Sequence, residues 1–216
     1  MLKEARGCTR CTLAAGRTQV VFGAGNANAD LMFVGEAPGF HEDQQGIPFV
    51  GRAGQLLEQR LAENGMARDD VFIANVLMCR PPGNRDPEAG EIATCQPYLM
   101  AKIELIEPSV ICTLGNFATK LLSGSSEGIT RVHGRSRLRE LGGRTVRLFP
   151  LFHPAAALRT PRVKEQLRED FGRLPALLAE GAPAQPRGEP PAARTPEAAP
   201  ERRPALDQLG LFASGP

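Results

Sequence analysis

The chain has 216 residues, 42% of them hydrophobic, and a formal net charge of +2 at neutral pH. That length is enough for one domain with a sizeable core plus an extension, and the small net charge excludes no class of partner. Its apolar runs fall well short of the ~18 residues of a membrane span, and its N-terminus lacks an apolar signal segment, so we expect neither a membrane-spanning nor a secreted protein.

Short apolar runs alternate along the chain with stretches of helical periodicity. The expected strands cover residues 31–34, 71–78, 110–114 and 146–152. The expected helices lie around residues 56–61, 98–106, 117–122 and 167–174. Strands that alternate with helices predict a three-layer α/β/α sandwich around a central, mostly parallel four-stranded sheet.

Two glycine- or proline-containing motifs follow expected strands directly. Residues 35–51, GEAPGFHEDQQGIPFVG, come after the first strand, and their glycines allow a ligand to approach the backbone. An exposed-looking aromatic, Phe49, stands in the second turn of this segment, and His153-Pro154 follows the last strand. Because the carboxyl ends of parallel strands meet at one edge of a sheet, we expect these motifs to converge there.

The five cysteines indicate a metal or cluster site rather than a disulfide framework, because their number is odd and no secretory signal is expected. Cys8 and Cys11 form a C-x2-C pair, whereas Cys79 and Cys95 are separated by fifteen residues. Zinc ribbons usually need two close pairs, while a four-thiolate iron–sulfur cluster tolerates wide spacing. Free buried thiols remain the alternative, and they suit Cys112, which lies inside an apolar run.

Several of these segments resemble one enzyme family. The 35–51 segment resembles the first active-site motif of the uracil-DNA glycosylase superfamily, most closely that of the family 4 enzymes, which carry an iron–sulfur cluster. Asn75 at the end of the second strand and the HPxxxL-like run 153–158 match further motifs in the family's order, as does the cysteine spacing. The resemblance covers residues 5–178 and implies a glycosylase domain at 1–180.

The resemblance implies uracil excision from DNA and a role for each matched residue. A uracil flipped out of the helix would stack on Phe49 and be read by the Asn75 amide, while His153 and the turn backbone would stabilise charge on uracil O2. Family 1 enzymes have an Asp where this chain has Ala37, so the water-activating group is unassigned. The implied catalytic residues are His153, Glu36 and Asn75; the uracil-binding residues are Gly35, Glu36, Ala37, Phe49, Asn75 and His153; the ligands of a structural [4Fe–4S] cluster are Cys8, Cys11, Cys79 and Cys95.

A basic run lies before the last strand, where residues 131–147 hold six arginines against one acid. Such a run can bind phosphates independently of sequence, although a solvated hairpin is the alternative. The expected DNA-binding residues are Arg131, Arg135, Arg137 and Arg159. We expect uracil-containing single- and double-stranded DNA as partners, a monomer, and a cytoplasmic, nucleoid-associated location.

The composition changes after Gly181. Residues 183–204 contain seven prolines and five alanines, so we expect a disordered linker over 181–204. A C-terminal peptide, 205–216, follows; its Gln208, Leu209, Leu211 and Phe212 resemble the peptide by which bacterial repair proteins bind the sliding clamp. The alternative is an apolar tail that docks on the protein's own surface.

Two other functions remain open at this stage. A family X-like protein would trap uracil-DNA covalently through a histidine on an arginine-rich insertion, but no such KRRIH-like loop follows the first motif here. An alternative from another class is a non-catalytic, clamp-tethered DNA-binding module. Treatment of uracil-containing oligonucleotides with the protein distinguishes all three functions.

Overall fold

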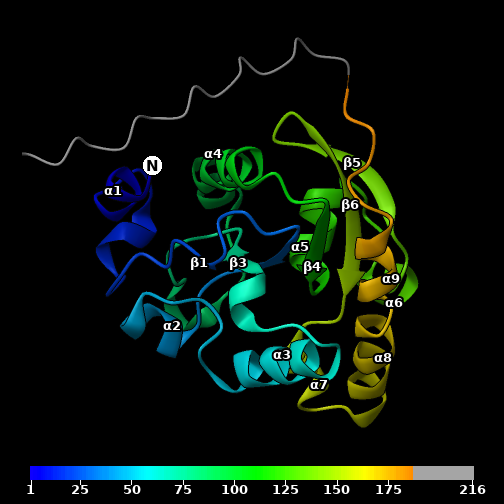
Figure 1. The fold of residues 1–216 in the computed structure, drawn as a ribbon. Helices are drawn as coiled ribbons and strands as arrows, with labels where there is room; N and C mark the ends of the chain where they lie inside the picture. The colour runs from blue at the N-terminus through cyan, green and yellow to red at the C-terminus, as the bar shows by residue number, and fades with distance from the viewer. Residues whose placement is uncertain (187–216) are drawn as a thin grey trace, which may run out of the picture. The chain divides into compact units, whose positions relative to one another are not determined.

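The computed structural model describes residues 1–186, and its centre is a six-stranded sheet with the order β1-β3-β2-β4-β6-β5 (Figure 1). Strands β3, β2, β4 and β6 are parallel, and the edge strands β1 and β5 run antiparallel to their neighbours. The strands are β1 (Ala24–Gly25), β2 (Leu31–Gly35), β3 (Phe72–Asn75), β4 (Val110–Leu114), β5 (Arg137–Leu141) and β6 (Arg144–Leu151). The expected four-stranded parallel core is confirmed.

The two edge strands were not among the strands expected from the sequence, although residues 131–147 were expected to lie on a hairpin or loop before the last strand. β1 is only two residues long, and β5, RLREL, carries arginines and is mostly exposed. Neither has the apolar run that marks a strand buried on both faces. Charged side chains of this kind keep an exposed sheet edge from pairing with other chains.

Helices cover both faces of the sheet. They are α1 (Leu2–Arg6), α2 (Phe40–Gln45), α3 (Arg52–Glu63), α4 (Ala89–Ile106), α5 (Asn116–Ser123), α6 (Ile129–Val132), α7 (Pro154–Ala157), α8 (Pro161–Phe171) and α9 (Leu174–Ala179). In β2, Met32 and Val34 pack into one core with α4 and α5, while Leu31 and Phe33 pack into the other with α3, α8 and α9. The alternation of side chains along a strand therefore produces the three layers.

The carboxyl ends of the parallel strands position the site. β2 ends at Gly35 and β3 at Asn75, and these two residues face each other in register. β6 ends at Leu151, two residues before His153, beside the end of β4. The loops after β2, β3 and β6 consequently leave the sheet at one edge, as predicted for the motifs they carry.

Three local expectations need correction. The single helix expected around 167–174 is two helices, because the chain turns at Gly172 and Arg173 before α9 begins. The HPxxxL-like run 153–158, for which no helix was expected, contains the short helix α7. The first residues of the expected linker are ordered against the sheet, since Gln185 Nε2 and Oε1 pair with the Thr145 carbonyl and N–H, each at 3.0 Å.

The rest of the expected linker and the C-terminal peptide lie outside the described residues. Within residues 1–186, no helix is long and apolar enough to span a bilayer.

Candidate functional site

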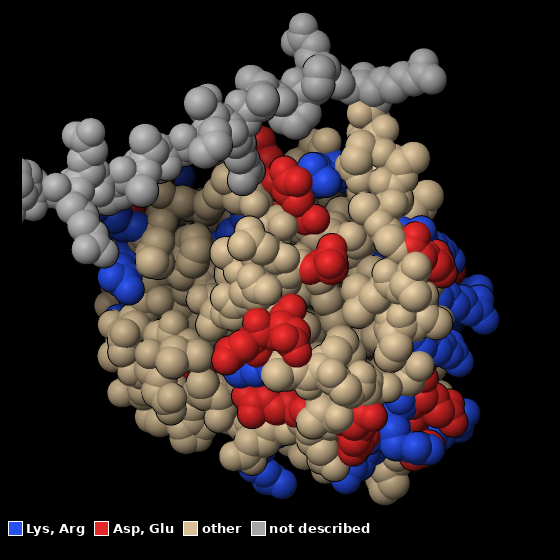
Figure 2. Space-filling view, viewed as in Figure 1, with Lys and Arg blue, Asp and Glu red and all other residues tan. Residues whose placement is uncertain are grey.

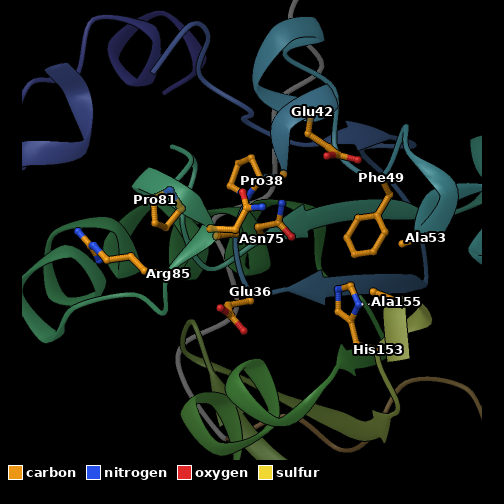
Figure 3. Close-up of a pocket in the computed structure, with 13 residues that line it drawn as sticks. Glu36, Pro38, Glu42, Phe49, Ala53, Asn75, Pro81, Arg85, His153 and Ala155 are labelled. Atoms are coloured by element: carbon orange, nitrogen blue, oxygen red, sulfur yellow. Dashed lines mark hydrogen bonds between the residues drawn. The ribbon is translucent and has the colours of Figure 1, made fainter. Parts of the chain in front are cut away.

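A cavity of about 350 Å³ lies at the carboxyl ends of β2 and β3 (Figure 3). Its walls come from three separate loops: residues 36–53 after β2, residues 75–85 from the end of β3, and His153 with Ala155 after β6. The volume is in the range typical of sites for small organic ligands. The motifs at residues 35–51 and 153–158 and Asn75 therefore converge as expected.

Asn75 has the most unusual hydrogen-bonding state in the cavity. Its side chain is 2% exposed, and Oδ1 has no hydrogen-bond partner among the described residues. Gly35 makes room for it, because a Cβ on Gly35 would lie 2.4 Å from Oδ1. A buried acceptor without a partner costs about 1–3 kcal/mol, so the site is arranged for a donor that the protein itself does not supply.

Phe49 forms one wall of the cavity in a strained backbone conformation. It is a non-glycine residue with φ of +55°, and it is only 6% exposed, so the expectation of an exposed ring was wrong. Arg68 holds this turn by donating to the Phe49 carbonyl at 3.1 Å and to the Pro48 carbonyl. Strain of this kind persists where the surroundings over-determine the conformation, and it is common at ligand sites.

His153 lies against Phe49 in the cavity wall, with 5.6 Å between the ring centroids and the ring planes tilted by 32° (Figure 3). The Ala155 N–H donates to His153 Nδ1 at 3.1 Å, so Nδ1 is the acceptor and Nε2 carries the proton. Burial lowers the pKa of His153 to about 4, although the charge of Glu42 opposes this shift. At neutral pH the residue is therefore a neutral imidazole that presents an Nε2–H donor.

Glu42 lies in the cavity wall, whereas its neighbour Asp43 does not. The backbone N–H groups of Val50 and Gly51 both donate to Glu42 Oε1 at 3.0 Å, which fixes the carboxylate beside Phe49. Asp43 is 3% exposed and instead accepts from the Thr18 N–H at 3.0 Å, thereby anchoring α2. The carboxylate beside the cavity therefore comes from α2, five residues beyond Ala37.

Glu36 borders two cavities. It lines the first one and also a neighbouring cavity of about 600 Å³, which it shares with His153. Its carboxyl points away from Asn75 (Figure 3). Burial, together with the nearby charge of Asp86, raises the pKa of Glu36 above its usual value.

Asn84 lines the cavity and was not singled out from the sequence. It has φ of +55°, and its Oδ1 accepts from Arg80 Nε at 2.8 Å. The signal that would have found it is the turn sequence Pro81-Pro82-Gly83-Asn84, since asparagine tolerates the left-handed conformation better than most residues. Arg85 also borders the cavity, but the buried Glu91 holds its guanidinium at 2.6 Å.

The four cysteines expected to hold a cluster lie near one another beside the first half of α4. Cys79 and Cys95 are buried, and Cys8 and Cys11 pack against the same core. Burial is the main reason that the pKa of Cys95 is raised to about 11, and the nearby Cys79 and Cys11 contribute to the same shift. The fifth thiol, Cys112, is fully buried in β4 within the other core.

The donors around these thiols suit an iron–sulfur cluster. Arg17 lies 3.5 Å from Cys79 Sγ, and the Met78 N–H lies 3.4 Å from Cys95 Sγ, so both sulfurs already have the hydrogen bonds that stabilise cluster thiolates. None of the five cysteines is in a disulfide. Within the described residues, no group of three His, Cys, Asp or Glu side chains is arranged to hold a metal ion.

The arginines of the 131–147 run do not all lie beside the cavity. The β5–β6 turn is at the opposite end of β6 from His153, and Arg144 and Arg147 there pair with Glu107 at 3.4 Å and Glu180 at 2.8 Å. Of the expected DNA-binding residues, Arg131 in α6 and Arg135 and Arg159 in loops are exposed near the edge of the sheet that carries His153. Arg137 pairs with Glu127 at 3.1 Å.

Charge of both signs covers the face seen in Figure 2. Acidic side chains occupy its centre, and basic ones crowd its right-hand margin beside α8, interleaved with acids. A single broad basic surface is therefore not a feature of this face.

Comparison with known proteins places this site in a family context. A family model described as the Uracil DNA glycosylase superfamily matches residues 22–172. The Type-4 uracil-DNA glycosylase of Sulfurisphaera tokodaii is 46% identical over 180 residues, which covers 81% of this chain and 82% of that protein. The Type-4 uracil-DNA glycosylase of Thermotoga maritima is 48% identical, and the match covers 70% of this chain and 78% of that protein. The Type-4 uracil-DNA glycosylase of Archaeoglobus fulgidus is 41% identical, and the match covers 85% of this chain and 94% of that protein.

Proposed function

The chain belongs to the uracil DNA glycosylase superfamily, and we propose that it starts base excision repair by hydrolysing the bond between uracil N1 and the sugar C1′ in deaminated DNA. The observation that carries this proposal is the buried Asn75 amide, whose Oδ1 lacks a partner. Uracil N3–H is a donor of the kind that this oxygen needs. The amide N–H group donates in turn to uracil O4.

This arrangement distinguishes uracil from cytosine. Cytosine presents an acceptor at N3 and a donor at N4, the reverse of uracil, so both contacts to Asn75 would place like groups together. A mismatched buried hydrogen-bonding pair leaves both groups unsatisfied, which costs several kcal/mol. The flipped base lies between Phe49 and the strand ends, where stacking adds about 1–3 kcal/mol.

His153 stabilises the leaving group. As the N1–C1′ bond breaks, its electron pair passes to uracil, and negative charge develops on O2. The neutral imidazole of His153 donates a hydrogen bond from Nε2–H to that oxygen. No change in its protonation is needed, because the Ala155 N–H holds Nδ1 as the acceptor. One preorganised donor of this kind contributes about 3 kcal/mol to the transition state.

Glu42 is our candidate for holding the attacking water. Two backbone N–H groups fix its Oε1. Its Oε2 lies close to Gly39, since a Cβ on Gly39 would be 2.7 Å from this oxygen. A water on Oε2 would lie in the cavity and attack C1′, giving up one proton to the carboxylate as the bond to uracil breaks. This assigns to Glu42 the work that an Asp performs in family 1 and that Ala37 cannot perform.

We further propose that Cys8, Cys11, Cys79 and Cys95 hold a structural [4Fe–4S] cluster. When bound, the cluster supplies a covalent cross-link between the N-terminal segment, the loop after β3 and α4. The protein's own contacts reinforce that cross-link: Arg17 donates to the Cys8 carbonyl at 2.6 Å and to the Arg6 carbonyl at 3.2 Å. The loop that begins at Cys79 also carries Asn84 into the cavity.

We propose that the protein binds phosphates of single- and double-stranded DNA, and the exposed Arg131, Arg135 and Arg159 support this. Its action as a monomer in the cytoplasm near the nucleoid stays a proposal from the sequence. The clamp-binding motif at residues 208–212 stays a proposal from the sequence. A pulldown with a bacterial sliding clamp tests it: wild type should be retained and Leu211→Ala/Phe212→Ala lost, and equal retention would refute it.

Uracil-containing single- and double-stranded oligonucleotides, followed by alkali, test the proposed function. We expect strand scission at the uracil position and none at a cytosine in the same position. An SDS-stable adduct would instead indicate covalent trapping, and binding without either product would indicate a DNA-binding module. Glu42→Gln should slow scission by at least about tenfold while uracil-DNA affinity is kept, since the amide retains the shape but accepts no proton.

A further inference from the structure

Phe40 is an exposed aromatic side chain at the rim of the cavity. Its side chain is 54% exposed, and it follows Gly39, a residue of the cavity wall. Among the large apolar side chains that are exposed in residues 1–186, it is the one aromatic. An exposed phenylalanine beside a binding site offers flat apolar surface to a planar ligand.

Arg80 is stacked on this ring from the loop after β3. Its guanidinium carbon lies 5.3 Å from the centroid of Phe40, and its Nε donates to Asn84 Oδ1 at 2.8 Å. His41 meets the ring edge-on with 5.5 Å between centroids. The cavity wall residues Gly39 and Asn84 therefore flank a cluster that joins an aromatic ring from the start of α2 to a cation from the loop after β3.

We infer that Phe40 and Arg80 form a platform for the nucleotide next to the flipped uracil, with the base on the ring and the phosphate at the guanidinium. This inference rests on the proposed function, because the uracil inside the cavity brings its neighbours to the rim. Aromatic side chains with adjacent arginines bind single-stranded nucleic acid in this way, and they are tolerant of sequence since every base has a flat face.

The chemistry favours nucleic acid over a protein as the occupant. An apolar protein partner would bury the Arg80 charge without a counter-ion, at a desolvation cost, whereas a nucleotide supplies both a base and an anion. An exposed phenylalanine without a function would need no such partner. Phe40 instead contacts Arg80, which is hydrogen-bonded to Asn84 in the cavity wall.

A thermodynamic cycle between the side chain and the neighbouring base tests the platform. The probes are short single-stranded oligonucleotides that carry one 2′-fluoro-deoxyuridine, which resists excision, flanked on one side by either a normal base or an abasic spacer. Dissociation constants are measured by fluorescence anisotropy for wild type, Phe40→Ala and Phe40→Tyr, with the spacer placed 5′ or 3′ in turn. The matched control is Leu105→Ala, which truncates a side chain that is 57% exposed on α4.

We expect Phe40→Ala to weaken binding of the oligonucleotide with the normal neighbour by roughly 5- to 100-fold, and Phe40→Tyr to restore it. When an abasic spacer replaces the neighbouring base on the side that contacts Phe40, wild type and Phe40→Ala should bind with equal affinity. Equal affinities of wild type and Phe40→Ala, or the same loss with and without the neighbouring base, would overturn the inference. A failure of the proposed function would be detected separately, because the wild-type protein would then not excise uracil from ordinary uracil-containing DNA.

Discussion

The Asn75 side-chain oxygen occupies the space that a side chain on Gly35 would need, since a Cβ there would lie 2.4 Å from Oδ1 and 2.9 Å from the Phe49 ring. The first residue of the glycine-rich loop is therefore small so that the recognition amide and the stacking ring can approach each other. The in-register pairing of Gly35 with Asn75 between β2 and β3 makes this contact obligatory.

Gly35→Ala should consequently lower kcat/KM for uracil excision by about 100-fold, because a displacement of this size at a reacting group is typically worth that much. Single-turnover excision measures it. Gly90→Ala is the matched control: a Cβ on Gly90 in α4 meets nothing within 4 Å, so full activity is expected. Full activity of Gly35→Ala would contradict the role assigned to Asn75.

Removal of the donor at His153 should act on the chemical step. His153→Ala is expected to reduce kcat by about 100- to 1,000-fold, as for the loss of one preorganised donor. Since the pKa of His153 is lowered to about 4, its charge does not change between pH 6 and 8. The wild-type pH–rate profile should then show no inflection from this residue near pH 6.5. An inflection there that disappears in His153→Gln would contradict the neutral imidazole.

The same pKa predicts a pH-dependent stability. In the unfolded chain the imidazole takes up a proton near pH 6.5, whereas in the folded protein it does so only near pH 4. Protons therefore favour the unfolded state as the pH falls from 6.5 to 4, and the free energy of unfolding should drop by at most about 3 kcal/mol on this account. The free energy of unfolding of His153→Ala, measured by denaturant titration at each pH, should fall less between pH 6.5 and 4 than that of wild type. An equal fall in the two proteins would refute this prediction.

Arg68 is a positioning residue, because it reaches Phe49 only through backbone carbonyls. Arg68→Met should raise KM about tenfold with a smaller effect on kcat, since stacking holds the base in both the ground and the transition state. Arg68→Lys should recover part of the loss. Glu58→Gln removes only the exposed ion pair to Arg68 at 2.8 Å and should leave KM unchanged. An equal loss in Glu58→Gln would show that the ion pair, and not the carbonyl contact, matters.

The cysteines allow a matched comparison of cluster and non-cluster thiols. Cys79→Ser should lose iron and acid-labile sulfide and lower the melting temperature, because the cross-link to the N-terminal segment is broken. Cys112→Ser should keep the full iron content, since that thiol lies in the opposite core. Loss of iron from Cys112→Ser, or its retention in Cys79→Ser, would argue against the proposed ligand set.

Local sequence patterns predicted the parts of the site that depend on strand ends. The apolar run of β2, the glycine after it and Asn75 at the end of β3 each mark the end of a buried strand, and parallel strands end at one edge whatever the remaining sequence. The contacts of Arg68 and Asn84 were missed. Arg68 reaches a carbonyl 19 residues away, and no periodicity within a window of ten residues reports such a distance.

The basic run shows the opposite case. Six arginines in 17 residues are plain in the sequence, but their function depends on which end of β6 each one reaches and which acid it meets. The antiparallel hairpin carries Arg144 and Arg147 away from the cavity and into pairs with acids from other elements. Exposure to DNA is a property of the folded surface, and the sequence does not contain it explicitly.

The sequence by itself determined the layered α/β class, the family and the identities of Asn75, Phe49 and His153, because each follows from local periodicity or from a contiguous motif. Only the tertiary structure decided that Asn75 Oδ1 is left without a partner, that Phe49 is held in a left-handed turn, and that Glu42 rather than Asp43 faces the cavity. These properties depend on which groups from distant segments satisfy one another, and long-range packing alone settles that.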